Sequence, residues 1–342
     1  MIPINTPLTK RLNIKTPIIC APMPFADTPE LAAAVTGAGG FGCIGAAYYS
    51  TTVLKEKIQK IRATLKIADG APVPLAVGFL GWLLDRTETG DDPRLGAILA
   101  ELPSAVWFAF GVDLEKYVDQ VHAHDEKSGR KTFVFVIISS VEDARTAATN
   151  GVDAVVVQGN EAGGHGGAEA PPLLTLLQAV LNEFKVGGGP LVVAAGGIST
   201  GAQIASLLTM GADGVVLGTR FLFTHECEYS PARKDALLKA DLNATVRAMA
   251  FDEVGRTMGW PPKCDGRAIA NKIMDDYVAG LSLEERLEKF DESAKSGDNE
   301  RLVVWAGVGA GLVGEIKGAA DVLRELHEET VVHLRRATKL LA

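Results

Sequence analysis

Apolar residues recur along the first two-thirds of the chain in one order: a short apolar run, a glycine-rich break and an amphipathic stretch. The runs do not alternate apolar with polar residues, which is typical of strands buried on both faces of a parallel sheet. The amphipathic stretches, such as Thr52–Leu65 and Gly201–Met210, are predicted to be helices that cover this sheet. The pattern predicts strands at Pro17–Ala21, Gly40–Ile44, Val73–Phe79, Ala105–Phe110, Thr132–Ile138, Ala154–Gln158, Leu191–Ala195 and Gly214–Gly218.

Eight alternations of strand and helix favour a (β/α)8 TIM barrel, an α/β fold in which the parallel strands close on themselves. Two similar units make the period visible, because Val141–Gln158 and Gly201–Gly218 each read as a helix, a glycine, an aspartate and a buried strand. Glycine just after a helix supplies the left-handed residue that ends it. A doubly wound open sheet has the same alternation and is the alternative.

The pattern changes after the eighth predicted strand. Between residues 230 and 311 the sequence has charged helical stretches and proline-containing loops but no clear buried strand. We interpret residues 230–311 as a mainly helical insertion that covers the barrel mouth, and residues 1–229 and 312–342 as the barrel. Val304–Val313 is apolar and glycine-rich, and is expected to return beneath the insertion against the site. Gly318–Leu341 is predicted to be the closing helix.

Composition places the chain among folded globular proteins, since 47% of its 342 residues are apolar and 22% are charged. The 34 basic and 42 acidic side chains give a net charge of −8, which argues against a nucleic-acid-binding protein. We find neither an apolar stretch that could span a membrane nor a signal-peptide pattern at the N-terminus. The four cysteines form no CxxC pair, so neither a metal site nor a disulfide framework is expected. We expect a soluble, cytoplasmic protein.

Ligands of such barrels bind beyond the carboxyl ends of the strands. After the first predicted strand, Ala21-Pro22-Met23-Pro24 forms a segment in which two prolines restrict the backbone. The thioether of Met23 is polarizable and suits the face of a flat ring. A stiff turn without a ligand is the alternative.

The sixth junction, Gln158 to Gly167, places one histidine, His165, among glycines directly after a buried strand. Glycines allow a ligand to approach the backbone closely and leave the imidazole uncrowded. Histidine suits proton transfer or the pairing of an anionic substrate near neutral pH. A loop histidine that hydrogen-bonds locally is the alternative. Structural or surface roles are expected for the other histidines, which are His122, His124, His225, His327 and His333.

The seventh and eighth junctions carry Gly196-Gly197 and Gly218-Thr219. Glycine-rich turns after strands 7 and 8 form the phosphate site of many barrels. We expect the amides of Gly197, Gly218 and Thr219, with the Thr219 hydroxyl, to hold a phosphate group. A plain tight turn is the alternative.

Four segments together resemble the nitronate monooxygenase family, formerly called 2-nitropropane dioxygenases: the region beginning APMPFADTPELAAAV, then VVVQGNEAGGHGG, VVAAGGIST and GADGVVLGTRFLFTHE. The resemblance implies an FMN-dependent barrel with His165 as the catalytic histidine. It implies that Met23 contacts the flavin through its main chain and that Gln158 hydrogen-bonds the flavin. The residues assigned to FMN are Pro22, Met23, Gln158, Gly163, Gly164, Gly196, Gly197, Gly218 and Thr219.

One segment departs from the family pattern. Many bacterial members place an asparagine at the end of the third strand, where this chain reads Val77-Gly78-Phe79-Leu80-Gly81-Trp82. A side-chain contact to the flavin is therefore not expected from this strand.

The activity that the resemblance implies is FMN-dependent oxidation of alkyl nitronates, such as propionate 3-nitronate, by O2 to a carbonyl compound and nitrite. The expected partners are the small nitronate anion and O2, without nucleic acid or membrane, and a homo-oligomer is left open. One alternative is an NAD(P)H-dependent flavin reductase of enoyl thioesters, whose barrel is similar. Further alternatives are a flavin-binding protein without turnover and a barrel that binds a phosphorylated substrate without flavin.

Overall fold

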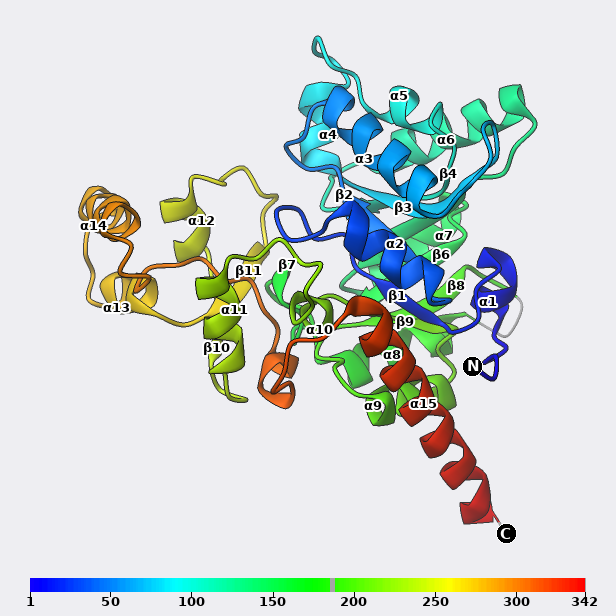
Figure 1. Cartoon of the computed structure of the whole chain (residues 1–342). Helices are drawn as coiled ribbons and strands as arrows, with labels where there is room; N and C mark the ends of the chain where they lie inside the picture. Colours follow the sequence, from blue (N-terminus) through cyan, green and yellow to red (C-terminus); the bar gives the residue numbers. More distant parts are fainter. Residues whose placement is uncertain (185–187, 342) are drawn as a thin grey trace.

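The computed structural model describes residues 1–184 and 188–341. Its main sheet contains eight parallel strands in the order β1-β9-β8-β6-β5-β4-β3-β2 (Figure 1). A bridge between Ile19 and Phe41 joins the two ends of this order, so the sheet forms a nearly closed barrel. All the predicted strands and the TIM barrel are confirmed, and the open sheet is not formed. The strands are β1 (Ile18–Cys20), β2 (Gly42–Gly45), β3 (Val73–Leu80), β4 (Pro103–Ala109), β5 (Phe133–Ile138), β6 (Ala154–Gln158), β8 (Leu191–Ala195) and β9 (Gly214–Leu217).

Each strand is apolar on both faces because it separates two cores. In β4, Val106 and Phe108 pack outward against the helices, whereas Trp107 points into the barrel with Phe135 of β5. The helix α1 (Pro7–Leu12) closes the amino-terminal end of the barrel, where Leu8 joins the interior core. This double burial explains why the sequence shows continuous apolar runs.

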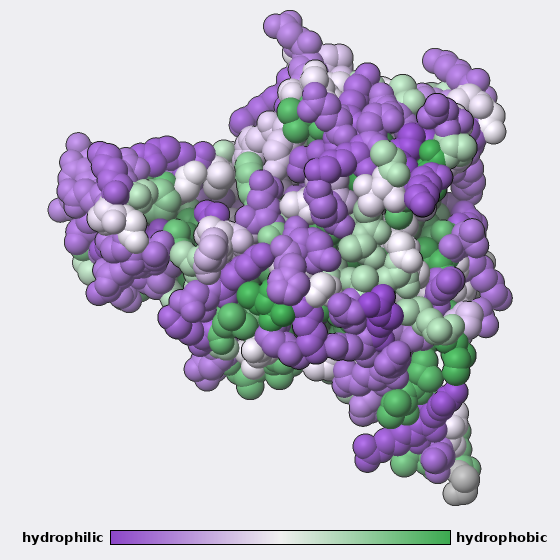
Figure 2. Space-filling view, viewed as in Figure 1, coloured by the Kyte–Doolittle hydropathy of each residue, from purple (hydrophilic) through white to green (hydrophobic). Residues whose placement is uncertain are grey.

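Helices cover the outside of the barrel, and their outer faces are mainly hydrophilic in the view of Figure 2. The glycines predicted to follow two of these helices do so: Gly151 follows α7 (Val141–Thr149) and Gly211 follows α9 (Gly201–Met210), with φ values of 72° and 113°. The covering helices are α2 (Pro29–Gly37), α3 (Thr51–Thr64), α4 (Gly81–Thr87), α5 (Leu95–Leu99), α6 (Glu115–Ser128), α7 (Val141–Thr149), α8 (Leu173–Glu183), α9 (Gly201–Met210), α10 (Thr219–Leu222) and α15 (Ala319–Thr338), followed by η2 (Lys339–Leu341).

The closing helix α15 packs against α9 and α2 (Figure 1). Gly201, the first residue of α9, makes this approach possible, because a Cβ there would lie 2.5 Å from the backbone nitrogen of Thr330. The amide of Gly201 donates to the carboxylate of Glu329 at 2.7 Å. Among the described residues, no helix is both long and apolar enough to cross a lipid bilayer.

Residues 230–311 contain helices joined by long loops and lie to one side of the barrel in Figure 1. The expectation that this segment lacks strands was wrong, because two of its strands form a three-stranded antiparallel sheet with the glycine-rich strand β7 (Gly164–Gly167). This sheet fastens the insertion to the barrel. Its status as a separate domain stays a prediction. The elements of the insertion are α11 (Pro231–Leu238), β10 (Thr245–Ala248), α12 (Ala250–Gly255), β11 (Cys264–Ile269), α13 (Lys272–Val278), α14 (Leu283–Ser296) and the start of η1 (Val308–Leu312).

Candidate active site

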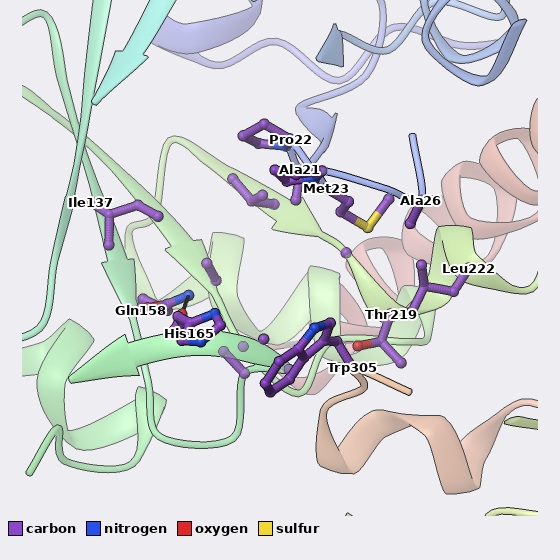
Figure 3. Close-up of a pocket in the computed structure, with 18 of the residues that line it drawn as sticks. Ala21, Pro22, Met23, Ala26, Ile137, Gln158, His165, Thr219, Leu222 and Trp305 are labelled. Atoms are coloured by element: carbon purple, nitrogen blue, oxygen red, sulfur yellow. Dashed lines mark hydrogen bonds between the residues drawn. The ribbon is translucent and has the colours of Figure 1, made fainter. Parts of the chain in front are cut away.

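A cavity of about 250 Å³ lies at the carboxyl ends of the barrel strands. Close-packed interiors contain few voids larger than a water molecule, so a cavity of this size indicates a ligand site. Figure 3 shows Gln158 and His165 on one side of it, and Thr219 and Leu222 on another. Every residue that the sequence assigned to the site lines this cavity.

The turn after β1 is held from beneath by a buried carboxyl group. Asp27 accepts hydrogen bonds from the amides of Met23 and Gly45, both at 2.7 Å. Burial raises the pKa of Asp27 to about 7, although Lys57, whose Nζ lies 4.0 Å away, lowers it. Asp27 therefore joins the turn to strand β2.

The two prolines of this turn pack directly over glycines of β2 and β3. A Cβ at residue 78 would lie 2.6 Å from Cβ of Pro22, and a Cβ at residue 45 would lie 2.6 Å from Cγ of Pro24. The third strand therefore has no space for a side chain at Gly78.

Met23 lines the cavity with its side chain, and Figure 3 shows its thioether beside Ala26. Its amide is already used by Asp27, and its carbonyl accepts from the amides of Ala26 at 2.9 Å and Asp27 at 2.8 Å. Both main-chain polar groups of Met23 are therefore engaged within the turn, so the predicted main-chain contact to a ligand would have to share one of them.

The turns after β8 and β9 form a group of backbone donors. Gly196 and Gly197 have φ values of 111° and 69°, which favour glycine. No described residue accepts a hydrogen bond from the amides of Gly197, Gly218 or Thr219. Unpaired amides at adjacent turns suit an anionic group such as a phosphate.

The returning segment crosses these turns, as predicted for Val304–Val313. The hydroxyl of Thr219 accepts a hydrogen bond from the amide of Gly307 at 2.9 Å. Gly163 permits the crossing, since a Cβ there would lie 2.3 Å from the Gly307 nitrogen. Trp305 and Gly309 of this segment line the cavity.

Gln158, at the end of β6, has a side-chain amide of which one end is hydrogen-bonded to the protein and the other is not. Its Nε2 donates to the carbonyl of His165 at 3.2 Å, as drawn in Figure 3. Its Oε1 is buried and has no hydrogen-bond donor among the described residues. A buried acceptor without a donor is costly, so a ligand that donates a hydrogen bond here fits the site.

His165 is held by residues of the insertion. Its Nε2 lies 2.9 Å and 3.0 Å from the two carboxylate oxygens of Asp252, a residue of α12 with no exposed surface. Oδ1 of Asp252 also accepts from the hydroxyl of Thr257 at 2.7 Å and from the indole of Trp260 at 3.0 Å. A carboxylate only accepts, so Nε2 carries the proton.

Aromatic rings fix the plane of the imidazole. Trp260 stacks on His165 with 3.5 Å between ring centroids and an angle of 10°, and Trp305 lies at 4.7 Å. Nδ1 of His165 makes no hydrogen bond to any described residue. Of the described residues that line the cavity, none is Asp, Glu, Lys or Arg, and His165 supplies the imidazole.

A model of the nitronate monooxygenase family matches residues 5–329. The chain belongs to the nitronate monooxygenase family. It is 34% identical to the nitronate monooxygenase of Neurospora crassa, covering 93% of this chain and 90% of that protein. It is 32% identical to nitronate monooxygenase npaC of Metarhizium robertsii, covering 91% and 90%.

Solved structures agree with this family assignment. FabK from Thermotoga maritima superimposes with a TM-score of 0.78 at 26% identity, covering 98% of this chain and 99% of that one. The nitroalkane oxidase from Streptomyces ansochromogenes gives a TM-score of 0.76 at 26% identity, covering 96% and 99%. The family resemblance and the barrel predicted from the sequence are confirmed.

In this member of the nitronate monooxygenase family, sequence reasoning missed Asp252, Thr257 and Trp260. Asp252 lies 87 residues from His165, in a short helix whose sequence gives no sign of a partner. The tryptophan in Gly259-Trp260-Pro261-Pro262 is the clearest local signal that was available. The five histidines given structural or surface roles all lie outside the cavity lining, and burial lowers the pKa of His327.

Proposed function

We propose that this protein binds FMN across the barrel mouth and oxidises alkyl nitronates with O2 to a carbonyl compound and nitrite. Membership of the nitronate monooxygenase family and the fold of the Streptomyces nitroalkane oxidase support this activity. The observation that carries it is the single ionisable imidazole of His165 in an otherwise uncharged cavity lining. Nitronates are small anions, and an imidazole can bind an anion by donating a hydrogen bond or, when protonated, by its charge.

The described residues fit FMN on two observations. The unpaired amides of Gly197, Gly218 and Thr219 would hold its phosphate, and the buried Oε1 of Gln158 would accept a hydrogen bond from its ring. When bound, FMN supplies the electron acceptor for oxidation of the nitronate carbon and for the later reaction with O2.

His165 would bind the substrate through Nδ1. Asp252 holds the proton on Nε2, so a neutral imidazole would carry its lone pair on Nδ1, the ring nitrogen left for a ligand. That lone pair can accept the α-proton of a neutral nitroalkane, which generates the nitronate. A protonated ring instead donates from Nδ1 to a nitro oxygen of the nitronate, and the Asp252 carboxylate balances its charge.

The insertion would exclude water from this chemistry. Trp260 covers one face of the imidazole, and Trp305 returns beneath it from the segment that crosses the barrel mouth. A dry site strengthens the electrostatic interaction between the imidazole and an anion. The insertion bounds 230–311 and a cytoplasmic location stay predictions, and the oligomeric state stays open.

The decisive experiment is the absorption spectrum of the purified protein, followed by anaerobic titration with an alkyl nitronate and, separately, with NADPH and NADH. We expect a flavin spectrum that the nitronate bleaches. Rapid bleaching by NAD(P)H alone would instead favour the enoyl-thioester reductase, which the similarity to FabK makes the second candidate. A flavin that neither reagent reduces would indicate a flavin-binding protein without turnover, and a colourless protein would indicate a barrel that works without flavin.

A further inference from the structure

We propose that the cavity selects nitronates with aromatic or long alkyl substituents and rejects those that carry a second negative charge, such as propionate 3-nitronate. This inference rests on the proposed oxidation of nitronates and specifies its substrate class. It assigns substrate selection to an apolar wall formed by Phe25, Tyr48, Leu80, Phe110 and Trp260, all of which line the cavity.

The rings of this apolar wall form a continuous series. Phe25 stacks on Tyr48 with 5.7 Å between centroids, and Phe110 meets Trp260 edge-on at 5.5 Å. Trp82, which does not line the cavity, packs against both pairs, with its ring centroid 6.4 Å from that of Tyr48 and 5.4 Å from that of Trp260. Since Trp260 also stacks on His165, the wall begins at the imidazole that would hold the nitronate group.

The backbone beneath the wall is strained. Phe25 and Phe110 have φ values of 67° and 55°, and Ala47, beside Tyr48, has a φ of 26°. Bulky residues rarely occupy the left-handed region, which glycine or asparagine adopts more easily. Strain of this kind gathers at ligand sites, where the surrounding structure maintains it. The positions of the two phenyl rings therefore fit a function in ligand contact.

The described residues of the cavity lining offer no free positive charge to a second anionic group on the substrate. The cavity lining described above contains no lysine or arginine, and the single imidazole is paired with Asp252. The neighbouring guanidinium groups are otherwise engaged, since Arg86 lies over the Trp82 ring at 5.0 Å and Arg94 donates to the Ala47 carbonyl. A carboxylate among these rings would lose its hydration without gaining a partner.

The mouth of the cavity is apolar as well. Phe25 and Tyr48 are 50% and 42% exposed, and they stack on each other at the entrance. Single exposed apolar residues are common, but a stacked pair beside a ligand cavity extends the apolar wall to the surface. An apolar substituent would therefore contact rings from the entrance to the imidazole.

The test compares kcat/KM of the flavin-loaded enzyme for the nitronates of 1-nitrohexane, phenylnitromethane and 3-nitropropionate, by oxygen uptake and by anaerobic flavin reduction. We expect both apolar nitronates to exceed propionate 3-nitronate by at least about tenfold. Equal or higher kcat/KM for propionate 3-nitronate would overturn the selectivity and leave nitronate oxidation intact. Absence of flavin reduction by all three nitronates would overturn the proposed function and this inference with it.

Variants make the test specific to the wall. Tyr48→Lys and Phe25→Lys add a cation at exposed positions and should shift the ratio of kcat/KM toward propionate 3-nitronate by about tenfold. Val112→Lys adds the same charge at a residue that is 90% exposed and outside the cavity lining, so its ratio should match that of the wild type. Equal shifts in all three variants would show that overall charge, and not the wall, sets the preference.

Discussion

The barrel and the insertion contribute to the same cavity in different ways. Around the proposed cofactor position the barrel presents mainly backbone groups, in the glycine turns after β8 and β9 and the rigid turn after β1, and it also supplies most of the apolar wall. The insertion presents side chains, because Asp252, Thr257 and Trp260 hold the imidazole of His165 by hydrogen bonds and stacking. The barrel is thus suited to holding a cofactor, and the insertion to orienting the residue that meets the substrate.

The largest effect should come from His165, where the two regions meet. His165→Asn removes the ionisable group from the cavity, and we expect turnover of nitronates to fall by about 10²–10⁴-fold while FMN stays bound. Turnover and flavin content should be measured together, with His333→Asn on the closing helix as a control. Turnover close to that of the wild type in flavin-loaded H165N would remove the imidazole from the mechanism.

A variant of the insertion tests whether it acts on chemistry. Asp252→Asn keeps the shape but can donate to Nε2, which would favour the tautomer with the proton on Nδ1. We expect kcat/KM for a neutral nitroalkane to fall by about 10–100-fold, and by less for its nitronate, with a changed pH profile. Thr257→Val removes one donor to Asp252 and should give an intermediate loss.

A purely structural role of Asp252 predicts a different result. D252N would then lower the melting temperature or the flavin content, while the pH profile and the ratio of nitroalkane to nitronate turnover would match the wild type. That outcome would show that the insertion covers the site but does not affect the chemistry of His165.

A variant of the barrel should affect cofactor affinity more than chemistry. Thr219→Val removes a hydroxyl that accepts from Gly307 and faces the proposed phosphate position. We expect the Kd for FMN to rise by about tenfold, from the loss of roughly 1–1.5 kcal/mol, with kcat nearly unchanged at saturating FMN. Thr209→Val, on the exposed side of α9, is the matched control. An unchanged Kd in T219V would place the phosphate elsewhere.

The smallest effect concerns the pH dependence of stability. The folded state raises the pKa of Asp27 from 3.8 to about 7, so folding favours its protonated form. This contribution to stability is complete below about pH 4 and is lost as the pH rises through 7. Between about pH 6 and 8 the melting temperature of the wild type should therefore fall more than that of D27N. Asp113→Asn, at an exposed position, should follow the wild type, and parallel curves for D27N would contradict the assignment.

Much of the barrel and its part of the site could be predicted from the sequence, because their signals are local. Strands between two cores are continuously apolar, as β6 is from Ala154 to Val157, and the glycine turns follow them directly. His165 stood out because glycines surround it. The contact between Pro22, in the turn after β1, and Gly78 could not be predicted from the sequence, because it depends on two strands that are distant in the chain lying side by side.

The insertion resisted prediction because its structure depends on contacts between distant segments. Strand β7 consists of glycines and one histidine, which have low intrinsic preference for strands, and it forms by pairing with β11. Strands β10 and β11 carry the half-buried Arg247 and Arg267, which make their pattern resemble a loop. Asp252 can be buried because His165 and Trp260 hydrogen-bond to it, and these residues become its neighbours only when the chain folds.

The pairing of β7 with β11 restricts how this family can diverge. His165 lies opposite Gly266 in that ladder, and side chains alternate between the two faces of a sheet. Loss of one residue within β11 would shift the ladder and move the side chains of β11 to the opposite face, so that Gly266 would no longer lie opposite His165. Segments such as α13 and α14 lie outside this sheet and can vary in length. Directed evolution of new specificity therefore has freedom at the periphery of the insertion and almost none in its central ribbon.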